Sequence, residues 1–131
     1  MWANRVMLPC FLLLAAGCLG RGQRYRHFQT TTPQPPGHCL ILGFLGGREP
    51  WNNGRDGVRR LALKLRALNR PGLHAETVEN RKRPLAIELI RNFFDRNEDG
   101  RLDEQERGPA RLILYGESFG GAAVVKLTRA L

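Results

Sequence analysis

The stretch Ala110-Arg-Leu-Ile-Leu-Tyr-Gly-Glu-Ser-Phe-Gly-Gly121 determines the fold that this sequence predicts. Its apolar run, residues 112–115, is typical of a buried strand and stops at Gly116, after which a small-residue helical pattern begins. Ser118, the only serine of the chain, stands at the junction. A strand that turns sharply into a helix holds a serine hydroxyl beyond the sheet edge and needs glycines where a side chain would clash. The stretch therefore predicts a nucleophile.

Two further apolar segments precede this strand, and each is followed by a helical pattern. Residues 39–42 form a short apolar run ended by Gly43, and residues 73–78 form a weaker one. Apolar residues recur at helical spacing in 58–68, and a second helical pattern opens at Pro84. The strand-helix unit thus occurs three times. It predicts an α/β fold, a parallel sheet with flanking helices in three layers.

The N-terminal residues 1–18 have the pattern of an export signal. A charged start at Arg5 precedes the apolar residues 6–16, which are too short for a membrane span of about 20 residues. The alternative is a buried N-terminal helix. Leu14-Ala-Ala-Gly-Cys18 resembles the lipobox of bacterial lipoproteins, whose cysteine is lipidated, although Ala15 stands where leucine is favoured. We expect an exported protein, either anchored to the cell envelope through Cys18 or secreted.

Residues 19–37 are basic and then rich in threonine and proline, a composition that predicts an extended tether before a domain at 38–131. Loss of the signal and lipidation of Cys18 would leave Cys39 alone, which excludes a disulfide framework and is typical of a small core residue.

The formal net charge of +9 does not by itself indicate a nucleic-acid-binding protein. Eighteen of the 21 basic residues are arginines, scattered from Arg5 to Arg129, and no basic block alternates with aromatic residues that would stack on bases. A solvated basic surface explains this distribution. We expect no nucleic-acid partner.

Gly116-Glu-Ser-Phe-Gly120 matches the Gly-x-Ser-x-Gly pattern, for which a serine that caps the next helix is the alternative interpretation. With the glycine-rich loop that follows residues 39–42, it resembles the α/β-hydrolase family over residues 38–131. The resemblance implies that Ser118 attacks an acyl carbonyl. It also implies that backbone N–H groups of Phe119 and Phe44, or Leu45 as a second choice, hold the oxyanion.

The rest of a catalytic triad is not evident. In the α/β-hydrolase family an acid and then a histidine follow the serine, but no Asp, Glu or His follows Ser118. His27 falls in the predicted tether, and His38 and His74 fall at strand beginnings, opposite the edge where Ser118 emerges. Without a base a serine hydroxyl is a poor nucleophile. We therefore expect the N-terminal part of a longer hydrolase or a truncated reading frame, inactive in this form.

The acidic residues are clustered, because six of the twelve lie in Asp95-Arg-Asn-Glu-Asp-Gly-Arg-Leu-Asp-Glu-Gln-Glu106. These twelve residues fit the calcium loop of EF-hands at each defining place, and they also resemble dockerin loops. Gly100 permits the sharp turn. The oxygen donors would be the side chains of Asp95, Asn97, Asp99, Asp103 and Glu106 and the carbonyl of Arg101. A solvated acidic turn is the alternative to a structural Ca²⁺ site.

Two functions from different classes fit these motifs. The first is an exported serine hydrolase that acts on a small-molecule or lipid ester or thioester and has a calcium-stabilised loop. The second is a non-catalytic, calcium-binding lipoprotein of the cell envelope.

Overall fold

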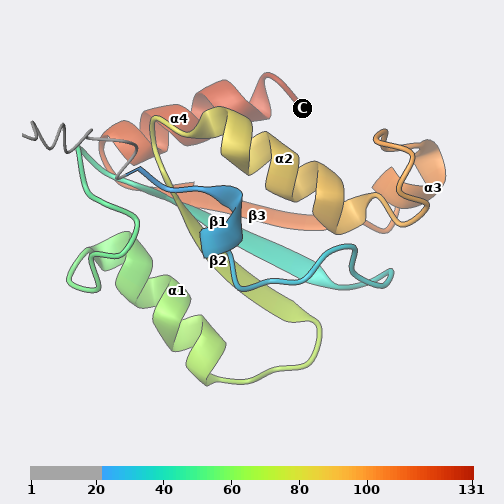
Figure 1. Ribbon diagram of the computed structural model, residues 1–131, viewed down its shortest axis with the longest axis horizontal. Helices are drawn as coiled ribbons and strands as arrows, with labels where there is room; N and C mark the ends of the chain where they lie inside the picture. The colour runs from blue at the N-terminus through green and yellow to red at the C-terminus, as the bar shows by residue number, and fades with distance from the viewer. Residues whose placement is uncertain (1–21) are drawn as a thin grey trace, which may run out of the picture.

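A three-stranded parallel sheet lies at the centre of the computed structural model, which describes residues 22–131 (Figure 1). Strand β1 (Cys39–Leu45) is central, with β2 (Leu73–Glu79) on one side and β3 (Arg111–Gly116) on the other. Both neighbours run parallel to β1. The predicted α/β class is confirmed at this level. The predicted signal and Cys18 lie outside the described residues.

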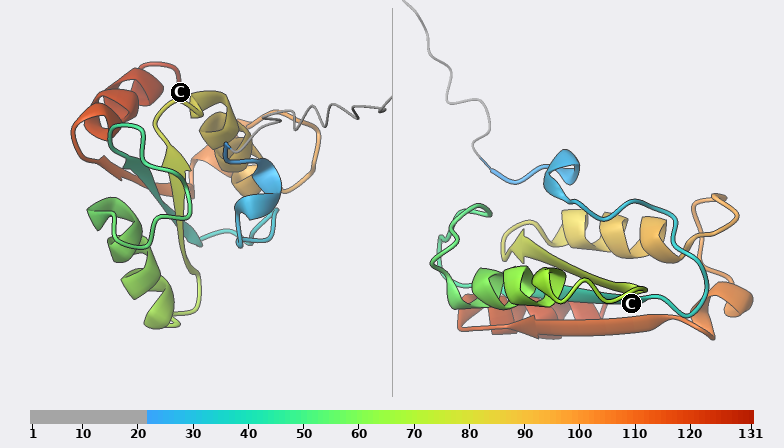
Figure 2. Two further views of the ribbon diagram at one scale, coloured as in Figure 1. Left: turned by 60° about the vertical axis from the view of Figure 1, so that its left-hand side comes forward. Right: turned by 90° about the horizontal axis from the view of Figure 1, so that it is seen from below.

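Helices cover both faces of the sheet (Figure 2). Helix α1 (Gly57–Ala67) packs against β1 and β2 on one face. Helices α2 (Arg83–Phe94) and α4 (Phe119–Thr128) pack on the other, where they bury the larger apolar core. The short helices η1 (Tyr25–His27) and α3 (Glu104–Arg107) lie outside these layers. Among residues 22–131, no helix combines the length and apolarity that a membrane crossing requires.

Strand β1 continues past Gly43, where the sequence predicts its end. A side chain at position 43 would have its Cβ 2.4 Å from Cζ of Tyr115 and 2.7 Å from Cγ1 of Val58. The glycine thus leaves room for Tyr115, whose hydroxyl donates to the carbonyl of Val58 at 2.8 Å. Burial raises the pKa of Tyr115 to about 12, so the phenol keeps the proton that it donates. Gly43 therefore marks a close approach inside a strand.

Residues 22–37, predicted as part of a tether, pack against the sheet. Gln23 is buried, and its side chain donates to the carbonyl of Thr77 at 2.7 Å and accepts from the N–H of Glu79 at 3.0 Å. It thereby occupies the outer edge of β2 as a neighbouring strand would. Further along, the buried carboxylate of Glu76 accepts from the backbone N–H groups of residues 29 and 30, at 2.7 Å each. The prediction of a free tether is wrong for this segment.

Candidate active site

The carboxyl ends of β1 and β3 form the edge of the sheet at which Ser118 lies. After β1 the chain passes to α1 on one face, whereas after β3 it passes to α4 on the other face. Two adjacent parallel strands whose connections leave toward opposite faces open a crevice between them. Ser118 lies between β3 and α4, at this edge of the sheet.

Ser118 has the backbone conformation of a strained turn. Its φ is 54° and its ψ is −121°, values that residues other than glycine rarely adopt. The side chain is exposed and makes no capping hydrogen bond to α4, although the residue stands at the N-cap position. A serine that only capped the helix would adopt an extended backbone and accept an N–H. The geometry favours a nucleophile over a cap.

The glycines on either side of Ser118 are required by close contacts between backbones. A Cβ at Gly116 would lie 2.5 Å from the carbonyl carbon of Gly120. A Cβ at Gly120 would lie 2.1 Å from the carbonyl oxygen of Phe44. These contacts press the first turn of α4 onto the end of β1. The Gly-x-Ser-x-Gly pattern thus has a steric cause at both glycine positions.

Of the segment predicted to supply an oxyanion donor, the residue that lies against Ser118 is Gly46. Phe44 lies inside β1, in register with Gly116, and Leu45 is its last residue. A Cβ built on Gly46 would be 3.1 Å from the carbonyl oxygen of Glu117 and 3.9 Å from Cβ of Ser118. Sequence reasoning missed Gly46 because it ended the strand at Gly43. Phe119 is the first residue of α4, next to the serine, as predicted.

The two strand-end histidines lie far from Ser118, as the sequence predicts. Nδ1 of His38 is 3.0 Å from Nε2 of His74, at the amino ends of β1 and β2. Strands of seven residues place this pair about 20 Å from the carboxyl edge. Burial, together with His38, lowers the pKa of His74, which is therefore neutral at pH 7.

His27 does not take the place of a catalytic base either. Its ring stacks on Trp51 at 4.1 Å between centroids, and its Nδ1 accepts the N–H of Arg24 at 3.0 Å. Cys39 also stays unreactive, since burial raises the pKa of its thiol. Within residues 22–131, the histidines are thus all engaged elsewhere.

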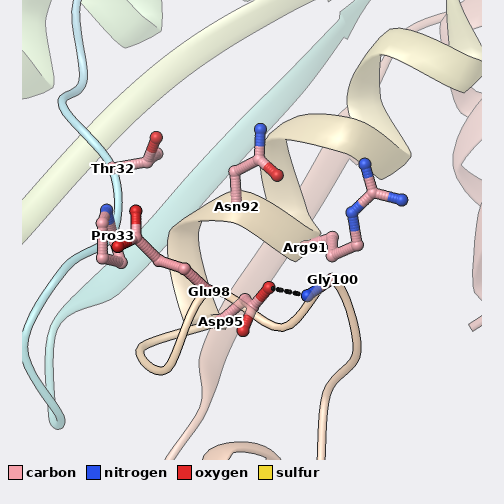
Figure 3. Close-up of a pocket in the computed structure, with 7 residues that line it drawn as sticks. All are labelled: Thr32, Pro33, Arg91, Asn92, Asp95, Glu98 and Gly100. Atoms are coloured by element: carbon pink, nitrogen blue, oxygen red, sulfur yellow. Dashed lines mark hydrogen bonds between the residues drawn. The ribbon is translucent and has the colours of Figure 1, made fainter.

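The acidic loop joins α2 to α3 and folds around Asp95. Oδ2 of Asp95 accepts the N–H of Gly100 at 2.7 Å (Figure 3). Its Oδ1 accepts the N–H of Asp99 at 3.2 Å. Gly100 has a φ of 81°, as the sharp turn at this position requires. A hollow of about 290 Å³ lies beside Asp95, between the loop and residues 32 and 33.

The last predicted ligand, Glu106, faces the backbone of the same loop. Its Oε1 accepts the N–H of Arg96 at 2.8 Å and its Oε2 accepts that of Asp103 at 3.1 Å. Asn97 and Asp99, by contrast, are exposed. In the described part of the chain, no three His, Cys, Asp or Glu side chains gather closely enough to hold a metal ion. Asp95 and Glu106 are nevertheless both buried, and neither forms an ion pair with any of residues 22–131.

The contacts at Gly120 predict a sharp difference between two adjacent glycines. Gly120→Ala should destabilise the protein by about 3 kcal/mol, because its Cβ would overlap the backbone of β1. Gly121→Ala is the matched control, since its Cβ would come no closer than 3.6 Å to its neighbours. It should be neutral or stabilising by up to about 1 kcal/mol, as alanine favours a helix. Urea unfolding of both variants measures the difference, and equal losses would contradict the described contacts.

The chain was compared with known proteins at three levels. Neither models of protein families, nor curated proteins, nor solved structures gave a match. The geometry of the described residues therefore carries the functional inference.

Proposed function

We propose that this protein is an exported serine hydrolase that acts on ester or thioester bonds, with Ser118 as its nucleophile. The observation that carries the proposal is the strained, exposed Ser118 between two glycines that no larger residue can replace. Strain of about 1–3 kcal/mol at one residue persists only where the surrounding structure enforces it, and such residues cluster at active sites. In this proposal the sheet and its helices are part of a three-layer α/β-hydrolase core.

The chemistry follows from what lies beside the serine. Oγ of Ser118 would attack an acyl carbonyl, and the oxyanion would be held by the N–H of Phe119 together with an N–H of the loop after β1. Such donors are worth about a hundredfold or more in rate each. No histidine of the described chain is placed to take the hydroxyl proton. We therefore expect attack without a general base, which leaves only the contribution of binding and the oxyanion donors.

The surface around the nucleophile favours an ester with an apolar group. Phe119 is 68% exposed directly beside Ser118. Its ring is therefore accessible to an acyl group bound at Ser118. Small-molecule and lipid esters both meet this requirement. A lipid anchor at Cys18 would place the protein at the membrane surface.

A structural Ca²⁺ at the acidic loop is the second part of the proposal. Two buried carboxylates, Asp95 and Glu106, have N–H donors but no cationic partner in the part of the chain that the structure describes, and a divalent cation would neutralise them. The turn at Gly100 and the donor set fit a hard cation that prefers oxygen ligands. Binding requires Glu106 to exchange its N–H contacts for the cation. The ion would stiffen the loop that leads into β3.

The proposed nucleophile predicts selective labelling of the only serine. A fluorophosphonate should modify Ser118 slowly: an Oγ–P bond forms, the P–F bond breaks, fluoride leaves and the hydroxyl proton passes to solvent. Peptide mass spectrometry locates the adduct, and Ser118→Ala supplies the blank. Thr128→Ala, which removes an exposed hydroxyl from the same helix, should leave the labelling unchanged. Protein that stays unlabelled at Ser118 would overturn the hydrolase.

The proposed calcium loop predicts a melting temperature that depends on Ca²⁺. At a concentration about a hundredfold above Kd, binding adds about 2.7 kcal/mol, which should raise Tm by about 10 °C relative to chelator. Glu106→Gln should abolish this shift. Glu104→Gln makes the same charge change two residues away at an exposed position and should keep it. Equal melting temperatures of the unmodified protein in calcium and in chelator would exclude the site.

A non-catalytic calcium-binding envelope protein is the second candidate function. This function is favoured because each of the three histidines is engaged in other contacts and none is placed to act as a base for Ser118. The two experiments together separate the candidates, because this function predicts the calcium shift without labelling of Ser118.

A further inference from the structure

Asn80 connects the end of β2 to the loop that lies against Ser118. It follows β2 directly, and its Nδ2 donates to the carbonyl of Leu45 at 2.9 Å and to that of Gly47 at 2.6 Å. One amide nitrogen carries two hydrogens, so both bonds form at once. The amide oxygen in the same place would face two carbonyl oxygens, which fixes the orientation of the side chain.

The two bonds determine where the peptide between Leu45 and Gly46 points. In a trans peptide unit the C=O and the following N–H point in opposite directions. Because Asn80 draws the carbonyl of Leu45 toward β2, the N–H of Gly46 points away from β2, toward β3 and Ser118. The sheet order β2-β1-β3 agrees with this direction. A Cβ built on Gly46 would lie 3.1 Å from the carbonyl oxygen of Glu117, the residue before Ser118, so Gly46 is beside the turn that carries the serine.

The next carbonyl of the loop is held as well. The carbonyl of Gly46 accepts the N–H of Glu49 at 3.1 Å. Three consecutive carbonyls, those of residues 45–47, thus have defined partners. Gly47 has a φ of 52°, a conformation that glycine adopts freely and that needs such partners to stay fixed. Without Asn80, only the Glu49 bond would hold one of these three carbonyls within the described residues.

We propose that Asn80 is a positioning residue that fixes the loop after β1 so that the N–H of Gly46 serves as the second oxyanion donor at Ser118. The inference rests on the proposed hydrolase function. It assigns the donor to Gly46, which follows β1, instead of to Phe44, which lies within the strand. Asn80 itself touches neither the serine nor a substrate, and it acts through the backbone of residues 45–47.

The test compares two half-buried asparagines. Asn80→Asp keeps the shape of the side chain but removes both N–H donors and places a carboxylate before two carbonyl oxygens. Asn92→Asp makes the same substitution near the C-terminal end of α2, where Nδ2 donates to the hydroxyl of Tyr25 at 3.1 Å and where that hydroxyl can donate to a carboxylate instead. Asn80→Ala removes the donors without adding charge. It replaces Asn80→Asp in the test if the aspartate variant fails to fold.

Two readouts are needed on the full chain. The rate of fluorophosphonate labelling at Ser118 should fall about tenfold to a hundredfold in Asn80→Asp and Asn80→Ala and stay unchanged in Asn92→Asp. NMR order parameters of the Gly46 and Gly47 amides should fall from about 0.85 to below about 0.6 in the Asn80 variants alone. The labelling loss should appear at temperatures well below the Tm of each variant.

The outcomes distinguish this inference from the function on which it rests. Unmodified protein that does not label at Ser118 overturns the hydrolase and the inference with it. Normal labelling of the unmodified protein and of both Asn80 variants overturns the inference alone. Ordered Gly46 and Gly47 amides in Asn80→Ala also overturn it, because the loop then does not depend on Asn80.

Discussion

The close packing of α4 against the end of β1 is the constraint on which the site depends. The carbonyl oxygen of Phe44 occupies the place of a Cβ at Gly120, and the backbone of Gly120 occupies the place of a Cβ at Gly116. The chain therefore has to reverse within the three residues between these glycines. Ser118 takes the strained backbone conformation that this short reversal demands, and its side chain is left exposed. Buried backbone contacts thus hold an unfavourable dihedral angle that an isolated turn would relax.

The other elements keep β1 in the position that this packing needs. The side chain of Tyr115 packs over Gly43, and its hydroxyl donates a hydrogen bond to the carbonyl of Val58 in the first turn of α1. This bond connects β3 to the helix on the face of the sheet opposite α4. Gln23 closes the outer edge of β2, and the buried Glu76 forms an ion pair with Arg66 at 2.6 Å as well as holding residues 29 and 30. The polar groups buried in and around β2 are thus largely paired, as buried polar groups must be.

Much of this arrangement could be predicted from the sequence, and the exceptions have identifiable causes. The sharp turn from strand to helix at Ser118 and the strand-helix order follow from patterns a few residues long, and both are present in the structure. The sequence predicts the end of β1 too early, at Gly43. In a sequence, a glycine that ends a strand cannot be distinguished from one that makes room for a neighbouring ring within the strand. Residues 22–37 misled because their composition suggests a tether, whereas their partners, Thr77 and Glu76, are fifty residues away. Asn80 had no local signal, since its importance lies in the carbonyls of Leu45, the last residue of β1, and of Gly47 in the loop that follows.

The fold forces Ser118 into a strained conformation that leaves its side chain exposed. The most direct measurement is the unfolding free energy of Ser118→Gly against that of Ser118→Ala. Both variants lack the hydroxyl, so they differ mainly in how well they tolerate a φ of 54°. The account predicts that the glycine variant is more stable by about 1 kcal/mol, despite the greater freedom of glycine in the unfolded chain. An alanine variant that is as stable as the glycine variant, or more stable, would contradict it.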